Sequence, residues 1–236
     1  MSHGQVWGLN YFQAAFSSSF TYPFTIVNWI KKNASQWDAS GSDYVFSFGA
    51  DFTADDDYIR VATVRDQVLF TARASSASSN ASVSFANGTY DDIWVPVVFV
   101  VTAINDRDGY VEDSSQTGAS TSSKTLAALD SFRVGRLMTS IGGFEGLIGD
   151  QAIFDKALST AEINTIVTTA GSGPELASIA PSNCLAWWST VLDTASYADL
   201  GANSGPTLVK DGTSPTYSAD HHGVESVGGL LLRRRR

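Results

Sequence analysis

The chain has 236 residues, of which 43% are hydrophobic and 11% are aromatic. This composition supplies enough apolar material for a large core and excludes a wholly disordered protein. The formal net charge is −9, and four of the 15 basic residues are the last four of the sequence, so residues 1–232 carry eleven basic against 24 acidic side chains. This acidic balance argues against binding to nucleic acid through phosphate contacts.

Short β-branched and aromatic runs separated by turns fill the first two thirds of the chain. Residues 65–67 lie between two such runs and predict a hairpin turn. The run at 94–103 is nearly all apolar, which indicates a central strand buried on both faces. A turn is expected at 105–109, where Asp and Gly gather. The expected strands are 24–31, 44–49, 58–64, 68–74, 80–85, 94–103, 110–113, 132–137 and 147–154. Strands at this spacing predict an all-β fold, an antiparallel β-sandwich.

One short helix is expected at 159–170. Ser159 and Glu162 have the spacing of a capping box, in which each side chain bonds to the other residue's backbone N–H. Ile163 and Ile166 follow on one helical face, and Gly171 provides the end.

At this helix the sequence resembles a known family. The stretch 146–163, GLIGDQAIFDKALSTAEI, is similar to the closing segment of concanavalin A-like, laminin G-type jelly-roll domains, where a G-x-I-D-E-V-x-I-Y strand runs into an A-L-S-x-x-E-I helix start. Segments 24–31, 94–111 and 132–136 resemble that family's F-T-I-S-A-W-V-K strand, its W-H-H-V-A-V hairpin and its L-x-I-G strand, in the same order. The resemblance covers residues 20–170 and implies a jelly roll.

The C-terminal part carries a second resemblance. CLAWWS at 184–189, with Asp193 after it, is similar to the first strand of such domains, L-V-A-Y-W-x-L. This implies that residues 183–225 fold back, supply a strand that the N-terminus lacks, and close one sandwich over residues 1–225. Residues 226–236 would then be a basic tail. The segment 217–224 is similar to tails of tailed-bacteriophage structural proteins.

No metal site is expected. Family members often hold calcium near one rim, but their paired acids are reduced here to Gly149-Asp150, so no full ligand set maps onto the chain. Calcium is the only cofactor that the resemblance leaves open. His221 and His222 are adjacent and would point to opposite sides of an extended segment, which makes a shared metal ion awkward.

Tryptophan side chains are the candidates for ligand binding. Trp37 lies in a polar stretch, and Trp187 and Trp188 must point to opposite faces of a strand, so one of the pair is expected on the outer face. We expect Trp37 and Trp188 to offer flat indole surfaces to a glycan. Catalysis is not expected, because glycoside hydrolases need paired carboxylates on one strand and no Glu-x-Asp-x-x-Glu pattern occurs.

The basic tail is the candidate for docking on a partner. Leu231 and Leu232 would anchor it, and the guanidinium groups would face an acidic surface of a neighbouring subunit. The four basic residues are Arg233, Arg234, Arg235 and Arg236.

Together these features predict a non-enzymatic structural module of a bacteriophage virion. We expect a capsid decoration or tail-associated protein, oligomeric, in contact with other virion proteins or copies of itself. A lectin-like module that binds a host-surface glycan is the alternative, and a glycoside hydrolase comes third. The single Cys184 excludes a disulfide within one chain, and no secretion signal or membrane-spanning run is visible, so we expect assembly in a bacterial cytoplasm.

Overall fold

The fold is known from a computed structural model. It describes residues 11–50, 57–75, 77–126, 129–137, 143–168, 176–188, 196–197, 205–211, 224–227 and 230–233. Within these ranges no helix has the length and apolar character needed to cross a membrane.

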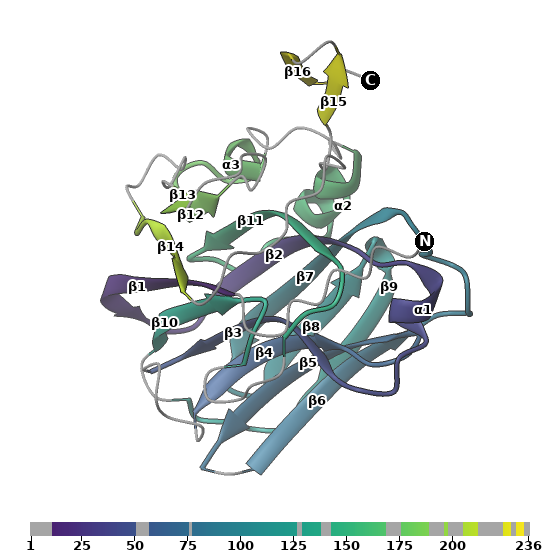
Figure 1. Ribbon diagram of the computed structural model, residues 1–236. Helices are drawn as coiled ribbons and strands as arrows, with labels where there is room; N and C mark the ends of the chain where they lie inside the picture. Colours follow the sequence, from purple (N-terminus) through teal and green to yellow (C-terminus); the bar gives the residue numbers. More distant parts are fainter. Residues whose placement is uncertain are drawn as a thin grey trace.

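Two antiparallel sheets pack face to face as a β-sandwich (Figure 1). The large sheet has eight strands in the order β13-β14-β1-β10-β3-β4-β5-β6, and the small sheet has six in the order β12-β11-β2-β7-β8-β9. The large sheet consists of β1 (Tyr11–Phe20), β3 (Asp43–Gly49), β4 (Tyr58–Thr63), β5 (Gln67–Ala74), β6 (Ala77–Ser84), β10 (Leu129–Val134), β13 (Ser196–Tyr197) and β14 (Leu208–Asp211). The small sheet consists of β2 (Phe24–Lys31), β7 (Trp94–Ala103), β8 (Asp106–Val111), β9 (Asp113–Ser120), β11 (Leu147–Phe154) and β12 (Cys184–Trp188). The predicted all-β sandwich is confirmed.

Three short helices and one hairpin complete the described elements. The helices are α1 (Ala34–Trp37), α2 (Thr160–Thr168) and α3 (Leu176–Ile179). Strands β15 (Val224–Val227) and β16 (Leu230–Arg233) pair only with each other, and Figure 1 shows this hairpin projecting from the body.

Strand β7 of the small sheet is buried on both faces. Val97 and Phe99 point into the core between the sheets, whereas Val98 and Val100 belong to a second apolar cluster on the outer face. Ile163 and Ile166 of α2 and Leu176 of α3 cover that outer cluster. The predicted central strand, buried on both faces, is therefore confirmed.

Helix α2 begins with the predicted capping box. The Ser159 backbone N–H donates to a Glu162 carboxylate oxygen at 2.8 Å, and the Glu162 backbone N–H donates to the Ser159 hydroxyl at 3.4 Å. Lys156 adds an ion pair with Glu162 at 2.8 Å. These contacts fix the helix start, so its apolar side is held against the small sheet.

Two buried cations connect the sheets. Lys32, directly after β2, is 2% exposed and donates to the Asp43 carboxylate at 2.6 Å and to the Thr63 hydroxyl at 2.8 Å, both on the large sheet. Arg107 of β8 is 1% exposed and donates to the Ser79 hydroxyl of β6 at 3.0 Å. Polar bridges of this kind must be matched at both ends, so they fix how the two sheets face each other.

The sheets also meet at β6 and β9, which are edge strands of the large and the small sheet. A Cβ atom at Gly118 of β9 would overlap the Ser82 backbone of β6. Only glycine permits this close approach of two backbones.

Three sequence expectations are wrong. The N-terminus does supply a strand, since β1 pairs with β10. The predicted turn at 105–109 is mostly strand, because β8 begins at Asp106 and buries Arg107. Strand β9 was not expected, because its sequence, DSSQTGAS, has no apolar residue except alanine. In addition, β12 pairs with β11 and β14 pairs with β1, so the C-terminal part contributes to both sheets.

Candidate functional site

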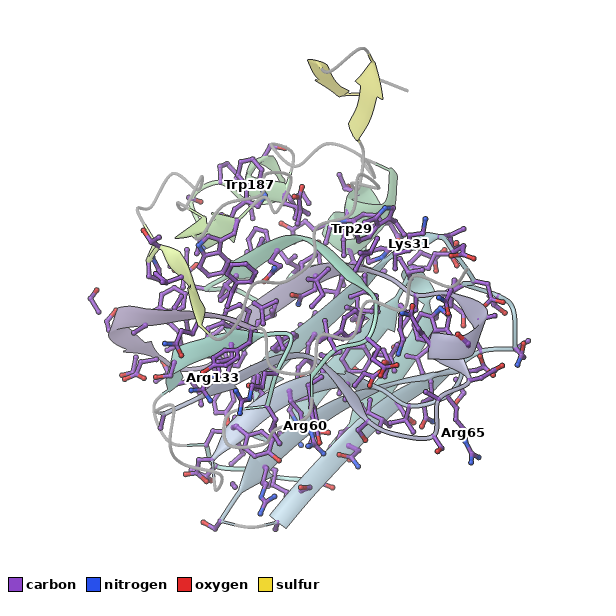
Figure 2. All side chains as sticks on the ribbon, viewed as in Figure 1. Trp29, Lys31, Arg60, Arg65, Arg133 and Trp187 are labelled. Atoms are coloured by element: carbon purple, nitrogen blue, oxygen red, sulfur yellow. The ribbon has the colours of Figure 1, made fainter. Side chains whose placement is uncertain are left out.

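The outer face of the large sheet carries arginine and tyrosine side chains at positions that alternate with the core. On β4, Ile59 and Val61 point into the core, so Tyr58 and Arg60 point outward. The same alternation directs Arg73 of β5 outward, beside the core residue Ala72. Figure 2 shows Arg60 and Arg133 on the large sheet, at the opposite side of the molecule from Trp29 and Trp187.

Each of these guanidinium groups stacks on a tyrosine ring. Arg60 lies 5.2 Å from the ring centre of Tyr44 and 5.7 Å from that of Tyr58, and Arg73 lies 5.8 Å from Tyr58. Across the sheet, Arg133 and Arg136 lie 4.9 and 4.6 Å from the ring centre of Tyr11. We call this set the Arg–Tyr face; its members are Tyr11, Tyr44, Tyr58, Arg60, Arg73, Arg133 and Arg136.

Strand register brings the arginines into one row. Arg133 of β10 pairs with Ser47 of β3, and Ser47 pairs with Arg60 of β4. Arg60 pairs in turn with Thr71 of β5. The Ser47 hydroxyl donates to the Arg136 carbonyl oxygen at 2.8 Å, which fixes the segment that carries Arg136. Arg133 and Arg60 are thus separated by one strand, roughly 10 Å at ordinary strand spacing.

The floor of this face and Arg133 are buried, whereas Arg60, Arg73 and Arg136 stay in part accessible. Tyr58 is 1% exposed and Thr71 is fully buried, whereas Arg60, Arg73 and Tyr44 are half-buried. Within the described part of the chain, the buried Thr71 hydroxyl and the buried Gln13 amide oxygen form no hydrogen bond. Arg73, Arg133 and Arg136 make further interactions besides the tyrosine contacts. Arg60 forms no ion pair with the part of the chain that the structure describes.

The charge of the Arg–Tyr face is opposite to that of the chain as a whole. It holds four of the eleven basic residues that precede the tail, and none of its seven members is a carboxylate. In a chain with a formal net charge of −9, four arginines are thus gathered beside aromatic rings on one sheet. Each guanidinium carbon lies 4.6–5.8 Å from a tyrosine ring centre, a distance at which the ring attracts the cation.

The two tryptophans expected to bind a ligand are buried in the core. Trp37 is 1% exposed, and its indole N–H donates to the Tyr90 carbonyl oxygen at 3.1 Å. Trp188 is fully buried, stacks on Phe132 and donates to the Pro206 carbonyl oxygen at 2.8 Å. Trp187 points the other way but is covered by α3, so it is only 5% exposed. The expectation that Trp37 and Trp188 offer indole surfaces to a ligand is therefore wrong. The adjacent positions of Trp187 and Trp188 in a strand predict that they point to opposite faces, but not which face is exposed to solvent.

The expected docking residues lie at the edge of what the structure describes. Leu231, Leu232 and Arg233 belong to β16, for which the backbone alone is described. Arg234, Arg235 and Arg236 lie outside the described residues. Their docking role stays a prediction.

Carboxylates gather at one rim without forming a metal site. Partial burial, together with the nearby charges of Asp38 and Asp91, raises the pKa of the Asp66 carboxyl above its usual value. Across the described ranges no three His, Cys, Asp or Glu side chains are grouped so that they could hold a metal ion. His221, His222, Asp55 and Asp56 lie outside those ranges.

Comparison with known proteins gives the fold. No family model and no curated protein matches the sequence. Among solved structures, the receptor-binding domain of botulinum neurotoxin D matches with a TM-score of 0.51 and 12% identity over 64% of this chain and 38% of that chain. Domains LG4-5 of the mouse laminin alpha1 chain match with a TM-score of 0.45 and 14% identity, over 65% and 43% of the two chains. The heptameric SAP-like pentraxin of Limulus polyphemus matches with a TM-score of 0.45 and 12% identity, over 68% of this chain and 82% of that chain.

At these identities the comparisons are evidence for the fold alone. The chain spans less than half the length of the toxin and laminin structures that it matches. The topology described above and the match to the toxin domain agree on an antiparallel jelly-roll β-sandwich.

Sequence reasoning missed the Arg–Tyr face, although a pattern for it exists. Tyr58 and Arg60, two residues apart in an expected strand, share its polar side, and Arg73 sits on the polar side of the next strand. Two neighbouring strands with arginine at outward positions would have predicted a cationic sheet face. The partners Arg133 and Tyr11 could not be added without the strand order.

Proposed function

We propose that this chain is a non-enzymatic binding module that works within a larger assembly, with the Arg–Tyr face as a contact surface. The observation that carries the proposal is the set of five guanidinium–tyrosine contacts on one sheet face. Among the described residues, α2 and α3 pack against an apolar cluster on the outer face of the opposite sheet. Oriented guanidinium groups on a flat scaffold suit recognition and supply no acid or base for hydrolysis.

Two observations support a role without catalysis. The Arg–Tyr face holds no carboxylate, whereas glycoside hydrolysis needs two. Two of the glutamates are already engaged: Glu162 in the capping box, and Glu112 as acceptor for the Tyr90 hydroxyl at 3.0 Å. The matching assay is reducing-end release from a β-glucan, for which we expect none; measurable release would contradict the proposal.

The assembly that we propose is a bacteriophage virion, formed in a bacterial cytoplasm. In it the chain would be a capsid decoration or a tail-associated protein that contacts other virion proteins or copies of itself. Support comes from the similarity of residues 217–224 to phage tails and from hairpin β15–β16, which ends in the basic tail and projects from the body (Figure 1). The acidic body of a neighbouring copy is a complementary surface for that tail.

A lectin-like module is the second candidate. The Arg–Tyr face favours it, because the half-buried Tyr44 ring and the arginine beside it, on a rigid sheet, are elements of a saccharide site. A host-surface glycan would then be the partner.

Light scattering of the purified full chain tests the assembly. We expect a mass above that of one chain of 25.2 kDa, and a lower mass after residues 226–236 are deleted. Substitution of Arg65, an exposed arginine outside the tail and the Arg–Tyr face, by Gln is the control and should leave the mass unchanged. A monomer that the deletion does not alter would contradict docking through the tail.

A further inference from the structure

We propose that Asn87 is a site of spontaneous deamidation, at which the side-chain amide is converted to a carboxylate without an enzyme. The inference goes beyond the proposed binding function and does not depend on it. It rests on three features of the described residues: the turn that carries Asn87, the hydrogen bond that its amide makes, and the carboxylates that surround it.

The reaction needs a backbone nitrogen beside an asparagine side chain. The Gly88 nitrogen attacks the side-chain carbonyl carbon of Asn87 and closes a five-membered succinimide ring. The proton that this nitrogen loses ends on the leaving amide group, so ammonia is released. Water then opens the ring at either carbonyl and gives aspartate or isoaspartate. Glycine favours the attack because it has no Cβ atom to obstruct it, and Asn87-Gly88 is the single Asn-Gly pair of the sequence.

The turn at 86–89 is the first feature. The Thr89 backbone N–H donates to the Ala86 carbonyl oxygen at 3.1 Å, and Gly88 has a φ of +82°, as in a type II turn. The Gly88 N–H lies outside that closing bond and makes no hydrogen bond within the part of the chain that the structure describes. Asn87 and Gly88 are both exposed, so water reaches the turn.

The hydrogen bond of the Asn87 amide is the second feature. Its NH₂ group donates to a carboxylate oxygen of Asp38 at 2.7 Å. Asp38 is the C-cap residue of helix α1, so this bond ties the turn to the end of that helix. A carboxylate at position 87 has no proton to donate, and two negative charges would then face each other. Deamidation therefore replaces an attractive contact with a repulsive one.

The surrounding carboxylates are the third feature. A Cβ atom at Gly88 would lie 3.8 Å from a carboxylate oxygen of Asp91. After partial burial, the charges of Asp38 and Asp91 contribute to the raised pKa of the Asp66 carboxyl. The neighbouring Arg65 forms no ion pair with the described residues. The reaction thus adds a negative charge to an acidic rim, and we expect the modified turn to separate from α1.

Peptide mass spectrometry of the full chain tests the reaction. The protein is stored in mildly alkaline buffer, and deamidation is followed at Asn87 and at Asn80, an exposed asparagine of β6 that precedes alanine. We expect Asn87 to react at least tenfold faster than Asn80 and to give both aspartate and isoaspartate.

Two variants test the chemistry of the attack. Gly88→Ala should slow the reaction at least tenfold, because a methyl group obstructs the nitrogen. Thermal unfolding checks that this variant folds, since a φ of +82° strains alanine. Asn87→Gln leaves Gly88 in place but would need a six-membered ring, so its side chain should react at least tenfold more slowly than that of Asn87.

Three further variants test the consequence for the contact with Asp38. Asn87→Asp represents the aspartate product and should lower the folded-to-unfolded ratio in a urea titration by roughly two- to fivefold. Asn87→Ala removes the hydrogen bond without adding charge and should lower that ratio less. The double variant Asn87→Asp/Asp38→Asn exchanges amide and carboxylate and should restore the wild-type ratio.

Several outcomes would overturn the proposal. They are equal rates at Asn87 and Asn80, a folded Gly88→Ala variant that reacts as fast as the wild type, or an Asn87→Asp variant that is as stable as Asn87→Ala.

Discussion

In both sheets, residues that point toward the core alternate with residues that point outward, but the outward residues differ in polarity between the two sheets. Both sheets direct every second residue into a shared apolar core. On the small sheet an apolar cluster that includes Val27, Val98 and Phe154 faces away from this core, and α2 and α3 cover it. On the large sheet the outward positions include arginine and tyrosine, and no described helix covers them. Residues that face away from the core thus decide which side of a sandwich becomes structural and which can take a ligand.

The largest expected effect comes from the covered face. Phe154→Ala removes a fully buried ring between β11 and the helices, and should lower the free energy of unfolding by about 3–5 kcal/mol. Denaturant titration measures it. Arg60→Gln on the open face is the comparison and should cost under about 1 kcal/mol. Equal losses would mean that the large-sheet face is as structural as the small-sheet face.

The bridge between the sheets is the next test. Lys32→Met leaves the Asp43 carboxylate buried without its cation, so it should cost about 3–5 kcal/mol in the same titration. The double variant Lys32→Met/Asp43→Leu removes both charges and should recover most of that loss. If the double variant is as unstable as the single one, shape rather than charge pairing holds the sheets at this point.

A smaller effect is expected at the start of α2. Glu162→Ala removes the capping box and should cost about 1 kcal/mol at neutral pH. Partial burial acts against the charged form, but hydrogen bonds from Lys156 and Ser159 outweigh it and hold the pKa of Glu162 below its usual 4.5. Because the pKa is depressed in the folded state, the charge stabilises the protein above pH 4.5 and this contribution is lost as pH falls through the folded value.

The pH dependence of Glu162 has a matched control. Glu162→Gln keeps a capping side chain without the charge. Its free energy of unfolding should be lower than that of the wild type at pH 7 and equal to it in strong acid. Urea titrations at several pH values follow the difference. A gap that persists in acid would show that the charge is not its source.

The smallest expected effect lies on the open face. Tyr44→Leu removes one of the two rings on which Arg60 stacks and should cost about 0.5–1 kcal/mol, whereas Tyr44→Phe keeps the ring and should cost less. Saccharide binding should weaken in the Leu variant and not in the Phe variant. If the Leu and Phe variants bind saccharide equally well, the Tyr44 ring does not orient the Arg60 guanidinium.

The sequence was sufficient for the elements that have a strong apolar pattern. The expected bounds of 24–31, 94–103 and 147–154 agree with β2, β7 and β11, and the capping box placed the start of α2. Strand β9 was not predicted, because its small polar residues give no periodic hydrophobic signal. It nevertheless forms one edge of the small sheet. Asp106 and Asp108 favour turns, and here the burial of Arg107 overrides that preference.

The candidate site was harder to predict than the fold. Trp37 and Trp188 stood out by residue type, but the depth of a side chain depends on which sheet covers it. The Arg–Tyr face combines residues as distant as Tyr11 and Arg136, which meet only after β1 and β10 pair. Local spacing can show that an arginine points outward, whereas strand order alone shows what lies beside it.

The glycine contact between β6 and β9 has a consequence for self-association. Edge strands normally expose backbone groups that can pair with a strand of another molecule and start aggregation. At Gly118 the two edges lie against each other, so neither is free to accept a further strand there. The opposite edges are β12 and β13, both from the C-terminal part of the chain. Among the described strands, the sheet edges that lie outside this contact therefore come from the C-terminal part of the chain.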